Sequence, residues 1–235
     1  MKKSIKALLN LLLVSGITLY GITEKQSFLI THVKKSIEMA SLEQSNIDKT
    51  FLTAEGMSSP KVRHFLNNVC NLTQANYLEI GVWKGSTFMA ALSNNTSLNS
   101  ATAIDNWAEF GGPRDAFYGQ IAKLNNSKLV TIYEKDAFQV DIKTAFKKKI
   151  DIYFYDGEHT FDAQKSAFTY YKDILADTFI AIVDDYNHPP AKAWTEAAFK
   201  ELGYTVLFEQ TLPANFNGDV NNWWNGLYVA VVTTK

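Results

Sequence analysis

The chain has one cysteine in 235 residues, so it cannot form an internal disulfide bond. No cysteine and histidine cluster shows the spacing of a zinc site. The formal net charge is only −1, and the one compact basic run, Lys147 to Lys149, is expected at the end of a helix. Because a nucleic-acid-binding protein normally carries a basic face, nucleic acid is not an expected partner.

Two common phosphate-binding motifs are also missing. In the stretch from Asn76 to Ser86, NYLEIGVWKGS, a short apolar run is followed by two glycines and the start of a predicted helix. A P-loop needs a lysine after its last glycine, but Lys84 precedes Gly85, and the dinucleotide motif G-x-G-x-x-G is absent. What remains is Glu79-x-Gly81-x-x-x-Gly85.

Such a strand-to-helix turn suits a cofactor, because its backbone N–H groups point outward and glycines let a ligand approach. A carboxylate at Glu79 would repel a pyrophosphate but attract a ligand with a positive charge and an amino group. S-adenosylmethionine (SAM), a sulfonium with an amino-acid tail, fits. The candidate cofactor residues here are Glu79, Gly81, Gly85 and Ser86; the alternative is a glycine-rich turn without a ligand.

Strand and helix patterns alternate along the rest of the chain, which predicts a mainly parallel sheet with one antiparallel strand. Two helices are expected first, over residues 27–40 and from Ser59-Pro60 onward. Strands are predicted at residues 77–80, 101–105, 128–133, 150–155, 178–183, 204–212 and 227–233, with helices at 87–92, 113–125, 161–176 and 190–202.

Acidic residues follow five consecutive predicted strands: Glu79, Asp105, Asp136, Asp156, Asp184 and Asp185. The carboxyl ends of parallel strands share one edge, where ligands bind. Since uncompensated carboxylates repel one another, this edge needs a cation. The first three suit SAM, with Glu79 near the amino-acid tail, Asp105 on the ribose and Asp136 toward the adenine amine.

The other three form an all-oxygen set typical of Mg²⁺. A metal held by Asp156, Asp184 and Asp185 would lower the pKa of an acceptor hydroxyl and hold it in line with the methyl group. Asp156 is also a candidate cofactor-binding and catalytic residue. His159, three residues further, is the candidate general base, although it could instead only contact substrate or a carboxylate. The alternatives for the acids are a helix-capping pair and an ordinary turn.

Aromatic and polar residues near these strand ends are candidates for binding the acceptor, and they suit a sugar or phenolic ring. Trp223 and Trp224 could instead plug the end of the sheet. Trp107 could also contact the cofactor. These candidates are Trp107, Phe110, Arg114, Asn187, His188, Trp223, Trp224 and Asn225.

With these motifs assembled, the chain resembles class I SAM-dependent methyltransferases, and more narrowly the macrocin and catechol O-methyltransferase-like (methyltransferase 24-type) groups. The resemblance covers residues 55–235 and rests on LEIGVWKGS (78–86), AIDNW (103–107), YDGEHT (155–160) and VDDY (183–186). It implies a Rossmann-like, seven-stranded sheet of order 3-2-1-4-5-7-6, Mg²⁺ on the three aspartates, and a base at His159. Catechol-type enzymes have a lysine shortly after the first metal ligand, but here the next lysine is Lys165.

These observations predict a helical cap at residues 24–75 and a SAM-binding domain at 76–235. The expected activity is metal-dependent O-methylation of a small hydroxylated acceptor. The alternatives are metal-independent N- or carboxyl-methylation, or a non-catalytic module docked through its N-terminal helix.

Residues 1–23 carry three lysines within their first six positions, and the apolar stretch from Ala7 to Ile22 that follows is sixteen residues long, fewer than the roughly 20 that span a bilayer. It is read as a helix packed on the domain or on a partner subunit, a membrane anchor, or an export signal. Export would separate the protein from cytosolic SAM, so a cytoplasmic location is expected, with membrane association through residues 1–22 or a homo-oligomer left open.

Overall fold

The computed structural model describes residues 21–235, so the helix expected within residues 1–23 lies almost wholly outside the described part. Between residues 21 and 235, no helix is both long enough and apolar enough to cross a membrane.

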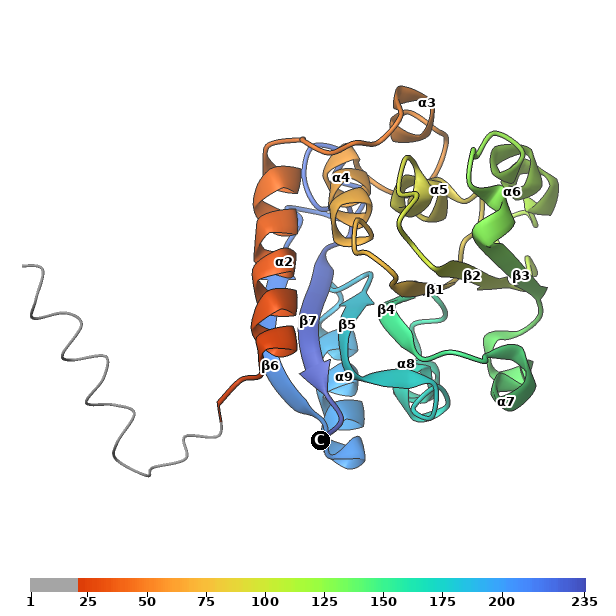
Figure 1. The fold of residues 1–235 in the computed structure, drawn as a ribbon. Coiled ribbons are helices and arrows are strands. Elements are labelled where there is room, and N and C mark those ends of the chain that lie inside the picture. Colours follow the sequence, from red (N-terminus) through yellow and green to blue (C-terminus); the bar gives the residue numbers. More distant parts are fainter. Residues whose placement is uncertain (1–20) are drawn as a thin grey trace, which may run out of the picture.

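The described residues form one seven-stranded sheet in the order β3-β2-β1-β4-β5-β7-β6 (Figure 1). Strand β7 runs antiparallel to β5 and β6, and the other pairings are parallel. The expected strand order and the single reversed strand are therefore confirmed. The strands are Asn76–Ile80 (β1), Ser100–Asp105 (β2), Val130–Glu134 (β3), Ile150–Tyr155 (β4), Leu175–Val183 (β5), Thr205–Leu212 (β6) and Leu227–Thr233 (β7).

Helices cover both faces of the sheet, as the near-continuous apolar sequences of β1, β4, β5 and β7 require (Figure 1). One buried cluster joins the sheet to the N-terminal helices and α5, and a second joins it to α8 and α9. The helices are Glu24–Ser41 (α2), Lys49–Leu52 (α3), Pro60–Val69 (α4), Ser86–Leu92 (α5), Arg114–Ile121 (α6), Ile142–Ala145 (α7), Phe161–Thr169 (α8) and Pro189–Leu202 (α9), with 3₁₀ turns at Ser127–Leu129 (η1) and Ala137–Gln139 (η2).

Three expected helix ends were wrong. The helix expected to reach residue 176 ends at Thr169, because Leu175 pairs with Ile150 and already belongs to β5. The helix expected to reach residue 125 ends at Ile121, since Asn126 turns back to donate to the carbonyls of Leu92 and Asn95. The lysines at 147–149 do not end a helix, because α7 stops at Ala145.

A substitution at Gly81 tests how tightly the ends of β1 and β4 approach each other. A Cβ there would lie 1.9 Å from the carbonyl oxygen of Asp156, and φ is +80°. Gly81→Ala should therefore lower the free energy of unfolding by more than about 3 kcal/mol, through backbone displacement and strain. Gly203→Ala is the control, because φ is +66° there but nothing lies within 4 Å, so only the conformational cost of about 1 kcal/mol remains. Equal losses in chemical denaturation would contradict this close approach.

Candidate active site

The loop between β1 and α5 turns on two glycines in the left-handed region, with φ of 80° at Gly81 and 84° at Gly85. Both lie where the sequence placed the cofactor turn. Each is also required by protein packing, since a Cβ on Gly85 would lie 2.8 Å from the ring of Phe117. The glycines alone therefore do not establish a ligand.

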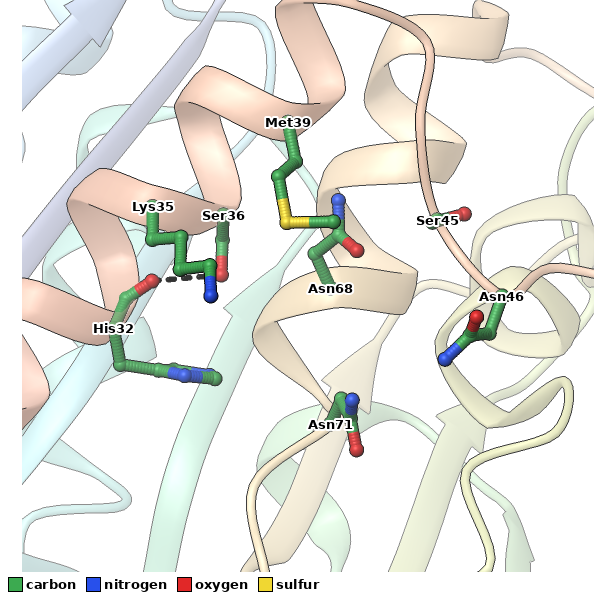
Figure 2. A pocket seen from close by; sticks show the side chains of 8 residues that line it. All are labelled: His32, Lys35, Ser36, Met39, Ser45, Asn46, Asn68 and Asn71. Carbon is green, nitrogen blue, oxygen red and sulfur yellow. Dashed lines mark hydrogen bonds between the residues drawn. The ribbon is translucent and has the colours of Figure 1, made fainter.

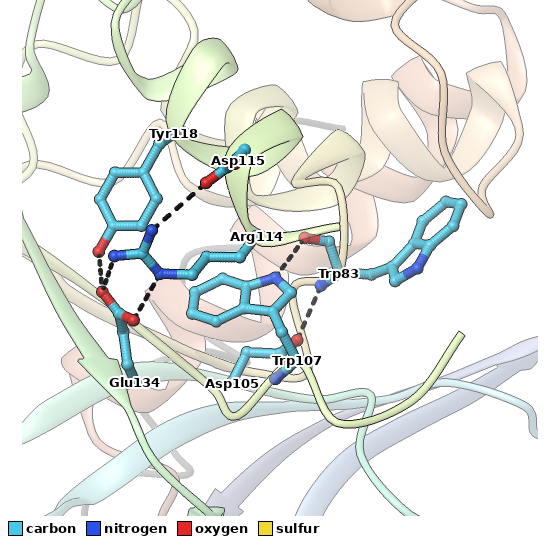
Figure 3. A network of polar contacts seen from close by, with 7 residues as sticks. All are labelled: Trp83, Asp105, Trp107, Arg114, Asp115, Tyr118 and Glu134. Carbon is cyan, nitrogen blue, oxygen red and sulfur yellow. Dashed lines mark hydrogen bonds and ion pairs between the residues drawn. The ribbon is translucent and has the colours of Figure 1, made fainter. Parts of the chain in front are cut away.

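Asp105, at the end of β2, holds this loop in place (Figure 3). One carboxylate oxygen accepts from the backbone N–H groups of Val82 and Trp83 at 2.9 and 2.8 Å, and the other accepts from the Trp107 N–H at 2.7 Å. The Trp107 indole in turn donates to the carbonyl of Trp83 at 2.8 Å. The residue predicted for the ribose thus also joins the ends of β1 and β2 into one surface.

Arg114, a predicted acceptor contact, is engaged by the protein itself (Figure 3). Its guanidinium donates to both oxygens of Glu134 at 2.6 and 2.8 Å and lies over the ring of Tyr118, whose hydroxyl also donates to Glu134. These donors hold the pKa of Glu134 well below its usual range. The sequence analysis missed Glu134 and Tyr118, and an acid directly at the end of β3 was the available signal.

Glu79 is fully buried on β1, with one oxygen bonded to the Tyr77 hydroxyl and the other accepting from the Thr87 hydroxyl at 2.5 Å. Burial raises the pKa of Glu79 to about 8, although both hydroxyls lower it. Nearby Asp184 and Asp105 raise it further. Glu79 therefore lies under the cofactor turn, and its charge depends on what else is at this edge.

Asp156 and Asp184 lie next to each other at the ends of β4 and β5. Burial and then repulsion raise the pKa of both groups, that of Asp184 to about 7. Asp184 is 5% exposed, and its Oδ1 atom has no hydrogen-bond partner among the described residues. Asp156 is partly buried, and two such carboxylates in contact need a proton or a cation between them.

Asp185 differs from these two acids because protein donors already bind it. The Asn225 amide donates to Oδ1 at 2.5 Å, and His159 Nε2 lies 2.9 Å from Oδ2. Burial alone would raise the pKa of Asp185, but these two partners bring it below its ordinary value. Burial would lower the pKa of His159, and its contact with Asp185 raises it instead.

Within residues 21–235, no three His, Cys, Asp or Glu side chains are arranged so that they could hold a metal ion. Asp156 and Asp184 nevertheless fit a divalent cation in their chemistry, because they are hard oxygen donors of like charge and one oxygen lacks a partner. Asp185 does not offer a free oxygen in this arrangement.

Two of the predicted acceptor contacts after β5 and β6 are already engaged by other parts of the protein. Asn187 exchanges two hydrogen bonds with the backbone of Ala214 and so fastens the last loop. Trp223 is 7% exposed and packs edge-on against Phe65, which fits the plug interpretation.

Three further predicted residues keep some exposed surface. His188 is exposed beside the ring of Trp194, and Trp224 is half-buried with φ of +58°. Asp136, past the end of β3, accepts from the Phe138 N–H at 2.8 Å and caps η2.

A pocket of about 220 Å³ lies between α2 and α4, on the helical cap (Figure 2). None of the strand-end acids lines it, so it is separate from the candidate site. Its lining residues are His32, Lys35, Ser36, Met39, Ser45, Asn46, Asn68 and Asn71.

Residues 78–186 match the profile of a family described as a methyltransferase domain. The matched segment, residues 78–186, is therefore a methyltransferase domain. No curated protein sequence matches the chain.

Solved structures share the fold of this methyltransferase. One is the O-methyltransferase from Bacillus cereus in complex with S-adenosylhomocysteine (SAH), with 14% identity, 86% of this chain and 91% of that chain covered, and a TM-score of 0.56. Another is the O-methyltransferase TomG from Streptomyces achromogenes, involved in tomaymycin synthesis and solved with SAM, with 18% identity, 86% and 89% coverage, and a TM-score of 0.54. At these identities the likeness establishes the fold.

The raised pKa of Glu79 predicts that the free energy of unfolding decreases as the pH rises. The folded protein keeps the proton up to about pH 8, while the unfolded chain releases it near 4.5, so the folded state is progressively disfavoured between those values. Glu79→Gln should therefore gain stability relative to the unchanged protein when chemical denaturation is compared at about pH 5 and pH 8.

The control is Glu38→Gln, on the exposed side of α2, for which the comparison should not depend on pH in this way. A Glu79→Gln difference that is the same at both pH values would show that the buried carboxyl is not protonated in the folded state.

Proposed function

We propose that this methyltransferase transfers the methyl group of SAM to a hydroxyl group of a small acceptor at the carboxyl edge of the sheet. The observation that supports it most is the pair Asp156 and Asp184, a partly buried and a buried carboxyl group with raised pKa values. One oxygen of Asp184 has no hydrogen-bond partner among the described residues. A sulfonium and a second cation would balance this charge. The relatives solved with SAH and SAM are O-methyltransferases, which supports the same reaction class.

The cofactor would lie against the loop from Gly81 to Ser86, where Asp105 holds the backbone and Trp107 forms one wall. Its sulfonium would stand near the acidic edge. Glu79 would then become ionised as the positive charge approaches, because an opposite charge favours the carboxylate form.

A divalent cation such as Mg²⁺ would be held by Asp156 and Asp184, with Asp185 as a third ligand once it gives up a present donor. When bound, it would lower the pKa of the acceptor hydroxyl and fix its oxygen. His159 would then accept the hydroxyl proton, with its ring oriented by the contact between its Nε2 atom and Asp185.

A second candidate is methyl transfer without a metal, to oxygen, nitrogen or a carboxylate. It is favoured by one observation: both oxygens of Asp185 already have donors, from Asn225 and His159. In that case His159 and Asp185 act as a hydrogen-bonded pair, and Asp156 and Asp184 orient the acceptor.

The proposed location is the cytoplasm, where SAM is available, and the proposed acceptor is a small sugar-like or phenolic molecule. Exposed His188 and half-buried Trp224 are the outward groups that support such an acceptor. Membrane association through residues 1–22 and self-association remain separate proposals.

Cofactor binding is tested by calorimetric titration with SAH. Asp105→Ala removes two hydrogen bonds to the loop and one to the Trp107 N–H, so SAH affinity should fall at least about tenfold. Asp141→Ala is the matched control, because Asp141 also holds backbone N–H groups but caps α7. Equal SAH affinity in all three proteins would reject this cofactor site.

Metal dependence is tested on product formation followed by mass spectrometry. If the reaction uses a metal, a chelator should remove most of the turnover and added Mg²⁺ should restore it. Asp184→Asn should weaken the restored activity at least about tenfold, because it removes one ligand charge. Turnover that resists the chelator would select the metal-free candidate instead.

A further inference from the structure

Arg63 on α4 is a buried cation without a buried anion. It is 4% exposed, and its Nη1 group donates to the carbonyls of Leu52 and Ala54 at 2.8 and 2.6 Å. In the part of the chain from residue 21 onward, no carboxylate forms an ion pair with it. Burial lowers the pKa of Arg63 to about 10, so it stays charged at neutral pH. Buried charges are normally balanced, so this one calls for an anion nearby.

A chain of hydrogen bonds links Arg63 through Ser58 to Ser86. Its Nε–H donates to the hydroxyl oxygen of Ser58 at 2.9 Å. The Ser58 hydroxyl lies 3.0 Å from the Ser86 hydroxyl, to which it can donate its own hydrogen. In that arrangement Ser86 accepts from Ser58, and the Ser86 hydrogen is left to bind a group outside residues 21–235.

The segment from Ala54 to Ser58 packs against the loop from Gly81 to Ser86. A Cβ on Gly56 would lie 2.1 Å from the Ser86 hydroxyl oxygen. On the other side, Lys84 forms an ion pair with Glu55. Ser58 and Ser86 are 6% and 5% exposed, so water screens their interaction weakly.

We propose that Arg63 is a positioning residue that acts through Ser58 to turn the Ser86 hydroxyl toward the carboxylate of the amino-acid tail of SAM. This inference rests on the proposed function. The carboxylate is the anionic group of SAM, whereas its ammonium and sulfonium groups would be repelled by Arg63. Arg63 and the acids Asp156 and Asp184 thus fix the two ends of the ligand by opposite charge.

The test compares SAM with decarboxylated SAM, which keeps the sulfonium and the amine but lacks the carboxylate. Calorimetric titration of the full chain gives both affinities. Ser58→Ala should weaken SAM binding about tenfold, as expected for a lost hydrogen-bond chain to a charged group, and change binding of decarboxylated SAM by less than about twofold. Arg63→Gln should act in the same sense, but it also removes bonds to the carbonyls of residues 52 and 54.

Ser59→Ala is the control for the Ser58 variant. Ser59 is the neighbouring buried serine, and it bonds to the N–H of Val62 and the carbonyl of Asn222 rather than to Ser86. Its loss should lower the melting temperature and leave the ratio of the two affinities unchanged.

The inference is overturned if Ser58→Ala weakens both ligands equally or neither, or if the unchanged protein binds them equally well. In those cases SAM binding persists in the unchanged protein and the proposed function stands. If the unchanged protein binds neither ligand, the proposed function and this inference both fail.

Discussion

The structure depends on the repulsion among carboxylates that the parallel strands bring to one edge. Glu79 and Asp184 are buried and Asp156 is partly buried, so water screens these carboxyl groups weakly and the pKa of each is raised. The nearest histidine, His159, is already bound to Asp185. The protein therefore supplies too little positive charge at this edge for all of these carboxyl groups to ionise, and a cationic ligand would stabilise their charged forms.

A positive charge lies on the other side of the loop from Gly81 to Ser86. Arg63 brings a buried positive charge to Ser58 and Ser86, while the acids lie at the ends of β1, β4 and β5. Asp105 holds the backbone between the two regions. A ligand with a carboxylate at one end and a sulfonium further along matches this separation of charge, which no single motif displays.

Much of this edge could be predicted from sequence, because the order of strands and helices decides which residues share it. The four strand-end motifs lie where expected, and β4 and β7 have the expected bounds. The face of β1 on which the Glu79 side chain lies could also be predicted from the sequence. Side chains alternate along a strand, so Glu79 shares a face with Tyr77 and points toward Thr87 rather than toward open solvent.

The partners of these side chains could not be predicted, because they come from distant segments. Arg114 meets Glu134 across 20 positions, and Asp185 meets Asn225 across 40. Trp223 packs on Phe65 through a contact that no local pattern encodes. Arg63 left a weak signal as a cation among the apolar residues of a short helix, which is uncommon unless the charge has a buried role.

The central claim is that a cationic ligand balances this edge, and proton release on binding tests it most directly. Titration of the protein with SAM near pH 7, in buffers of different ionisation enthalpy, gives the number of protons released. Because Glu79 and Asp184 have pKa values of about 8 and 7 without the ligand, the arriving sulfonium should displace protons from them into the buffer. Binding with no proton release, or with proton uptake, would contradict the account.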